Sequence, residues 1–206
     1  GVDPLLSLLV LVPLFAALGM TLQSVFARFA ITPFNSLLVT FGITVSVEAL
    51  LQWIWSADFR RMASFYDEHK FRLGSVVVTY SEALTLGMSL AAVALVWWML
   101  HRTDMGKSVR ASAEDPAIAT AFGINAKRLA VLLAGLCAAL AACAGVCVAL
   151  TFTLAPSQIF SWVGVVFAVV MIGRLGSALT PLLGGLVIGI SESMTQALIA
   201  PTWAPL

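Results

Sequence analysis

Long apolar stretches alternate with short polar segments along the chain, and four of the stretches are long enough to cross a membrane. They are expected at about residues 5–26, 37–55, 83–100 and 129–150. A helix needs roughly 20 apolar residues to cross about 30 Å of hydrocarbon. The pattern therefore predicts an all-α integral membrane protein, built as a polytopic bundle of five to six transmembrane or re-entrant helices.

The last third of the chain is less regular. The apolar stretch 159–172 is short for a full crossing, so it is either a re-entrant segment or a short tilted helix. The stretch 182–200 is long enough to cross. The topology of 157–206 stays open at this level.

The composition supports a membrane protein and argues against nucleic-acid binding. Hydrophobic residues make up 61% of the chain and charged residues only 10%, against a charged share of roughly 25% in soluble domains. The chain has eleven Lys and Arg and ten Asp and Glu, so its formal net charge is only +1. Such a balance gives no general attraction to nucleic acid.

Basic residues predict which side of the membrane each polar segment faces. One side is expected to hold Arg28, Arg102, Lys107, Arg110, Lys127, Arg128 and Arg174. The opposite side holds the smaller basic set of the polar loop 58–72. Because Lys and Arg accumulate in cytoplasmic loops, the segment 101–128 is expected in the cytoplasm.

The sequence contains no recognisable catalytic constellation. The GxSxG, HExxH and Walker-type phosphate-loop patterns are all missing. The three cysteines, Cys137, Cys143 and Cys147, share one apolar stretch without a neighbouring His or a CxxC spacing, which favours a packing role over metal binding. We therefore expect no catalytic and no metal site, which leaves transport, signalling or assembly as a membrane subunit.

The polar segment 101–128 encodes a short helix with its own capping residues. Asp115 is a good N-cap, and Pro116 suits the first helical position. Gly123 can adopt the left-handed conformation that ends a helix, and Asn125 can then cap the fourth span. The result is a helix of about two turns between two membrane spans.

One face of this short helix is apolar, because Ile118 and Phe122 lie four residues apart. Isolated helices of this length are marginal in water, so the helix is expected to lie against something. An interfacial helix lying on lipid and a docking helix for a cytosolic partner explain the pattern equally well.

Several motifs are similar to one known family, the permease subunits of bacterial branched-chain amino acid ABC transporters of the LivH type. The residues 105–107, 110–115 and 119–125 resemble the cytoplasmic loop of that family. The glycine pairs and polar residues at 176–177, 184–185 and 189–192 resemble its C-terminal signature. The resemblance extends along the chain and implies a single transmembrane permease domain, 1–206, with a cytoplasmic coupling segment at 101–128.

The resemblance implies a set of partners and residues that couple to them. Coupling to an ATPase would fall to Glu114, Asp115, Ala117, Ile118, Ala119, Phe122 and Gly123. The chain would have no ATPase activity and no cofactor, because cytosolic ATP-binding subunits would bind the ATP. A second permease subunit, a periplasmic or extracytoplasmic substrate-binding protein and membrane lipid complete the implied partners. The location would be the bacterial inner membrane.

Branched-chain or other small amino acids are the implied substrates. Permeases for urea, short amides or simple sugars remain alternatives, as does a membrane scaffold or signalling subunit that transports nothing. The family has further helices at both ends, so the resemblance also implies that this chain is a truncated copy or a partial sequence.

Two further groups of residues are candidates for the membrane interior. Charged and polar groups are costly in lipid, so Glu192, Gln52 and Gln23 are possible pathway-lining residues. Small residues permit close approach of helices. On that ground we expect helix packing at Gly135, Ala139, Gly145, Gly185 and Gly189.

Overall fold

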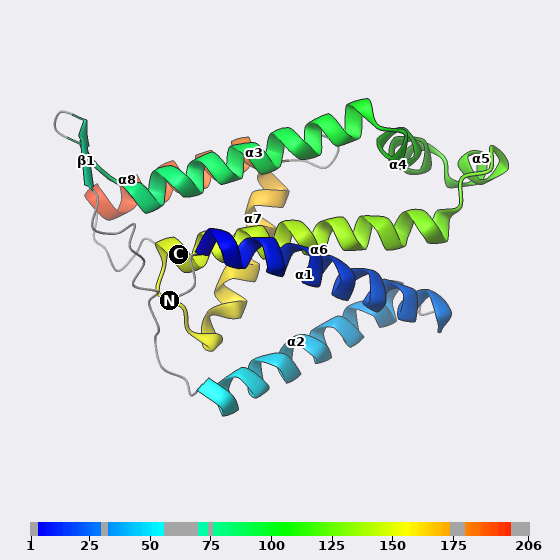
Figure 1. Cartoon of the computed structure of the whole chain (residues 1–206), viewed down its shortest axis with the longest axis horizontal. Coiled ribbons are helices and arrows are strands. Elements are labelled where there is room, and N and C mark those ends of the chain that lie inside the picture. Colours follow the sequence, from blue (N-terminus) through cyan, green and yellow to red (C-terminus); the bar gives the residue numbers. More distant parts are fainter. Residues whose placement is uncertain (1–3, 30–32, 56–69, 74–75, 174–179, 199–206) are drawn as a thin grey trace. The chain divides into compact units, whose positions relative to one another are not determined.

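The computed structural model describes residues 4–29, 33–55, 70–73, 76–173 and 180–198 (Figure 1). The chain divides into two compact units, Gly1–Pro156 and Ser157–Leu206, and each is described by itself. A single permease domain over 1–206 stays a prediction.

The first unit holds six helices and one β-hairpin within its described residues. In chain order they are α1 (Pro4–Arg28), α2 (Pro33–Trp55), β1 (Lys70–Leu73), β2 (Val76–Thr79), α3 (Tyr80–Arg102), α4 (Asp104–Glu114), α5 (Pro116–Ala121) and α6 (Ala126–Thr151). Of these helices, α1, α2, α3 and α6 are long and apolar enough to cross a membrane. The predicted helical membrane fold is confirmed, and these four helices coincide with the four predicted spans.

The β-hairpin was not predicted. Its antiparallel strands pair Arg72 with Val77 and Leu73 with Val76. The run Val76–Val78 is β-branched, which favours strand over helix. The predicted polar loop 58–72 lies outside the described residues except for 70–72, which belong to β1.

Helix α6 is the central helix of the first unit. It contacts α1, α3 and α4, and its buried positions are Leu129, Gly135, Ala142, Val146 and Leu150. Two of these residues, Gly135 and Ala142, are small, which lets neighbouring backbones approach closely.

The second unit contains two helices that contact each other, α7 (Ile159–Gly173) and α8 (Thr180–Leu198). A 3₁₀ turn, Pro156–Gln158, precedes α7. With 15 residues, α7 is as short as the sequence suggested, and its re-entrant or tilted course stays a prediction. Arg174 of the predicted basic set and the glycine motif at 176–177 lie outside the described residues.

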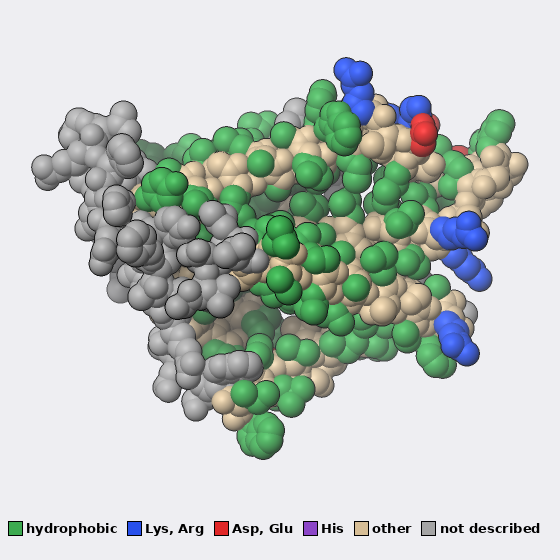
Figure 2. All heavy atoms as spheres, viewed as in Figure 1, with side chains coloured by type: hydrophobic (Ala, Val, Ile, Leu, Met, Phe, Trp, Pro, Cys, Tyr) green, Lys and Arg blue, Asp and Glu red, His purple; other side chains and the backbone are tan. Residues whose placement is uncertain are grey.

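The basic side chains that the structure describes in the first unit gather at one end (Figure 2). Arg28 lies in the last turn of α1 and Arg102 in the last turn of α3, while Lys127 and Arg128 open α6. The short helices α4 and α5 lie at this end too (Figure 1). The structure thus brings together the described residues that the sequence placed on one membrane side. The assignment of that side to the cytoplasm stays a prediction.

Candidate functional site

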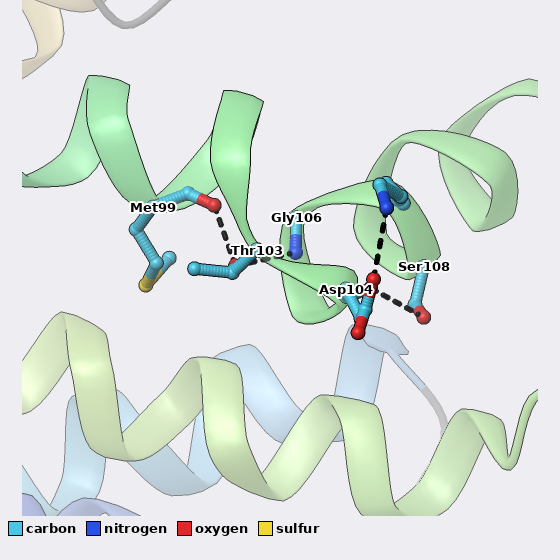
Figure 3. A network of polar contacts seen from close by, with 6 residues as sticks. Met99, Thr103, Asp104, Gly106 and Ser108 are labelled. Atoms are coloured by element: carbon cyan, nitrogen blue, oxygen red, sulfur yellow. Dashed lines mark hydrogen bonds and ion pairs between the residues drawn. The ribbon is translucent and has the colours of Figure 1, made fainter.

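Thr103 forms the corner between the membrane span α3 and the polar helix α4 (Figure 3). Its hydroxyl donates to the carbonyl oxygen of Met99 (2.6 Å), and the same oxygen accepts from the backbone N–H of Gly106 (3.2 Å). One side chain therefore satisfies a carbonyl at the end of α3 and an amide at the start of α4. This bridging fixes the direction in which α4 leaves the span.

Gly106 is buried at this corner because the end of α3 lies directly against it. A β-carbon built on Gly106 would meet the backbone of Leu100 and would lie 2.5 Å from the carbonyl oxygen of Met99. Real β-carbons essentially never come that close, so glycine is required by the contact and not by an unusual φ. The α3–α4 corner is thus both capped and tightly packed.

Helix α4 begins with an ion pair on its exposed face. The Nζ of Lys107 donates to Oδ1 of Asp104 at 2.9 Å. This hydrogen bond and the lysine charge hold the pKa of the Asp104 carboxyl below its usual range. A carboxylate in the first turn is also favoured by the helix dipole.

Helix α5 begins as the sequence predicted. Oδ1 of Asp115 accepts from the backbone N–H groups of Ala117 (2.8 Å) and Ile118 (3.0 Å), and Pro116 occupies the first turn. Asp115 also ends α4. The two short helices therefore share one capping residue.

Helix α5 ends in a Schellman motif. The N–H of Ile124 donates to the carbonyl of Ala119 (3.1 Å), and the N–H of Gly123 donates to that of Thr120 (3.0 Å). Gly123 has φ +89, the left-handed conformation predicted for it. Asn125 then caps α6, because its Oδ1 accepts from the N–H of Arg128 (3.1 Å). The predicted capping roles of Gly123 and Asn125 are confirmed.

The side chains of α5 divide into a buried and an exposed group. Ala119 is 4% exposed, whereas Ile118 is 56% exposed and Phe122 85% exposed. Both large apolar side chains thus lie open to a partner, while the backbone that carries them is held at both ends by caps. Glu114 and Ala117 are exposed as well, and Asp115 is half-buried. The coupling role of these residues stays a proposal.

The candidate pathway residues are scattered along three helices. Gln52 of α2 donates through Nε2 to Oε1 of Glu48 at 3.1 Å, so the polar groups of this apolar helix pair with each other. Gln23 is half-buried on α1. Glu192 is exposed on α8 of the second unit. A pathway role for Gln52, Gln23 and Glu192 stays a prediction.

The small residues expected to pack helices have different surroundings. A β-carbon on Gly135 would lie 2.7 Å from Cγ of Met20, on the facing helix α1. Ala139 is half-buried on α6. A β-carbon built on Gly145, Gly185 or Gly189 would meet no atom within 4 Å. For those three glycines, a role in helix packing stays a prediction.

Sequence reasoning missed helix α4 and three residues that position it or the spans. Thr103, three residues before Gly106, is a helix N-cap signal that was readable in the sequence. Glu82 accepts from the backbone N–H of Thr79 (3.2 Å) at the start of α3, and the spacing Thr-x-x-Glu is the capping-box signature. Gly19 of α1 also contacts α6, but no local signal marks its partner.

Four apolar helices of membrane-crossing length, with a capped polar segment between two of them, define a multi-pass membrane protein. Residues 1–206 match the family model described as the branched-chain amino acid transport system permease component. The chain therefore belongs to this permease family. Its apolar helices and its permease relatives make it a multi-pass protein of the bacterial inner membrane.

Individual relatives match over part of their length. The high-affinity branched-chain amino acid transport system permease protein LivH of Escherichia coli is 29% identical over 133 residues, 64% of this chain and 43% of the relative. BraD of Pseudomonas aeruginosa, a permease protein of the same description, is 28% identical over 122 residues, 59% of this chain and 40% of BraD. The fructose import permease protein FrcC of Rhizobium meliloti is 30% identical over 150 residues, 68% of this chain and 40% of FrcC.

The chain thus spans less than half the length of the relatives it matches. No solved structure matches it.

Proposed function

We propose that the chain is the membrane-spanning permease subunit of an ABC importer for branched-chain amino acids and that α5 is its coupling helix. The observation that carries the proposal is the exposure of Ile118 and Phe122 on a short helix capped at both ends. Two large apolar side chains on a fixed backbone suit insertion into a groove of a partner protein. ATP hydrolysis would belong to cytosolic ATP-binding subunits, and this chain would need no cofactor of its own.

The caps give the coupling helix a mechanical link to two spans. Thr103 joins α4 to α3, Asp115 joins α5 to α4, and Asn125 joins α5 to α6. A displacement of α5 by a closing ATPase pair would therefore be passed to α3 and α6 without melting a helix end. Rigid-body movement of packed helices would then switch the pathway between outward-open and inward-open states.

Cysteine crosslinking in native membranes tests the docking. Ile118→Cys should crosslink to an ATP-binding subunit, whereas Thr120→Cys, exposed on the same helix but about 200° around it, should not. Equal crosslinking from both positions, or labelling of Ile118→Cys by lipid-phase reagents alone, would contradict the proposal and favour a helix that lies on lipid.

The remaining partners are a second permease subunit and an extracytoplasmic substrate-binding protein. Support comes from the family to which the chain belongs. Copurification of the full-length protein with the proteins bound to it would test for the second permease subunit and the substrate-binding protein in one experiment. Recovery of the protein alone, with no ATP-binding or substrate-binding chain, would favour a scaffold or signalling subunit.

A sugar is the second candidate substrate, because the fructose permease FrcC matches a larger share of this chain than LivH does. Reconstituted transporter should take up leucine, isoleucine or valine if the first proposal holds. Uptake of fructose and not of these amino acids would favour the second. Urea or short amides would be tested in the same assay.

A further inference from the structure

An open cavity of about 400 Å³ lies between the last turns of α1 and the first turns of α6. Its lining residues are Ser24, Ala27, Lys127, Arg128, Val131 and Leu132. The exposed lining is almost entirely apolar, so Lys127 and Arg128 contribute to it mainly through the hydrocarbon parts of their side chains. The cavity therefore has an apolar lining to which two cationic side chains belong.

A third cation, Arg28, is adjacent in sequence to a lining residue of the cavity. Arg28 follows Ala27 in the last turn of α1. Within the described part of the chain, none of Arg28, Lys127 and Arg128 forms an ion pair with a carboxylate, whereas Lys107 does. Two cations in the first turn of α6 also oppose the dipole of that helix. A bound anion would relieve this local excess of positive charge.

The expected depth of the cavity in the membrane favours one class of anion. Arg28 ends one candidate span, Ser7–Arg28, and Lys127 and Arg128 begin another, Ala126–Thr151. From these span ends we expect the three cations at the level of the lipid headgroups and the apolar lining on the hydrocarbon side of them. A free anion would use the cations but not the apolar lining, whereas a phospholipid would use both.

We propose that this cavity is a binding site for one anionic phospholipid. Its headgroup phosphate would lie at Arg28, Lys127 and Arg128, and one acyl chain would run along Ala27, Val131 and Leu132. Basic pockets between membrane helices bind acidic lipid headgroups by this combination of charge and apolar contact. The site is separate from α5 and does not depend on what α5 binds.

Native mass spectrometry of the full-length protein in detergent tests the site. Dioleoyl phosphatidylglycerol should bind more tightly than dioleoyl phosphatidylcholine, which has the same acyl chains and no net charge. The variant Lys127→Gln/Arg128→Gln should weaken phosphatidylglycerol binding by about fivefold for each cation removed. The control Lys107→Gln/Arg110→Gln removes the same charge from α4 and should change binding by less than about twofold, because these residues do not line the cavity.

A second variant distinguishes the contribution of the apolar lining from that of the cations. Leu132→Trp fills the lining and keeps every cation, and it should also weaken phosphatidylglycerol binding. Gel filtration establishes that each variant is folded, and Arg28→Gln replaces the double variant if that one does not fold. Equal binding of the two lipids, an equal loss in the α4 control, or displacement of the lipid by inorganic phosphate would each overturn the proposal.

Discussion

Gly19 of α1 lies directly against the backbone of Ala134 of α6. A β-carbon built on Gly19 would lie 2.6 Å from the carbonyl oxygen of Ala134 and 2.6 Å from Cβ of Ala138. The reciprocal contact at Gly135 is softer, because a β-carbon there would first meet Cγ of Met20, which is flexible. The α1–α6 interface therefore depends on glycine more strictly at position 19 than at position 135.

Gly19→Ala should separate the two helices and lower the free energy of unfolding by about 1–3 kcal/mol, the usual cost of overpacking. Gly135→Ala should cost less than about 1 kcal/mol, because Met20 can change rotamer. Thermal unfolding of the full-length protein in detergent would measure both. Gly145→Ala in α6 is the control, since no atom lies within 4 Å of its added methyl group. A Gly19→Ala protein as stable as that control would contradict the packing argument.

Gly106→Ala should displace α4 from the end of α3, because the new methyl group would collide with the backbone of Leu100 and Met99. Backbone atoms cannot move aside as a side chain can, so we expect a loss of about 1–3 kcal/mol. Faster hydrogen exchange in Asp104–Glu114 would report it. Gly87→Ala in α3 meets no atom within 4 Å and should leave exchange unchanged. Unaltered exchange in Gly106→Ala would show that α4 is not held by this contact.

Thr103→Val should loosen α4 without changing its side-chain volume much. The variant loses the hydroxyl that bridges Met99 and Gly106, and the loss of an N-cap costs about 1 kcal/mol. Protease sensitivity between α3 and α4 is a suitable measurement. Thr103→Ser keeps the hydroxyl and should behave as the wild type. If the two variants are equally sensitive, the methyl group and not the hydroxyl holds the corner.

The parts of the site that could be predicted from sequence are those fixed by neighbouring residues. Asp115, Pro116, Gly123 and Asn125 act on amides and carbonyls within a few positions of themselves. Their residue types alone therefore indicate where α5 begins and ends and where α6 begins. The same logic applied to Thr103 would have predicted α4.

Contacts between distant segments could not be predicted in this way. Nothing near Gly19 in the sequence marks Ala134 as its neighbour, because the contact depends on how α1 and α6 pack. The cavity at Ala27 and Leu132 needs the same knowledge. Likewise, the exposure of Phe122 can be read only after α5 has been placed beside α4. Hydrophobic periodicity predicts where the spans lie in the sequence, but it does not show which spans pack against each other.

Asp115→Ala should fray the start of α5, because the amides of Ala117 and Ile118 lose their acceptor. We expect a cost of about 1 kcal/mol in local stability. Crosslinking from Ile118→Cys to an ATP-binding subunit should fall in the same background, since the side chain would no longer be held in place. Asp115→Asn retains the capping oxygen and should retain the crosslink. Full crosslinking in Asp115→Ala would mean that docking does not require a preformed α5.

The Asp104–Lys107 pair predicts a pH dependence that can be measured at one carboxyl group. The hydrogen bond and charge of Lys107 lower the pKa of Asp104 in the folded protein below its ordinary value of 3.8. The stabilisation of α4 by this pair is therefore present above about pH 4 and is lost as the pH falls through the folded pKa. Both side chains are exposed, so salt should screen the effect. Carboxyl-selective NMR of the full-length protein should show the pKa of Asp104 rising toward its ordinary value in Lys107→Gln and staying low in Lys107→Arg. An Asp104 pKa that is the same in Lys107→Gln as in the wild type would show that the ion pair is not formed in solution.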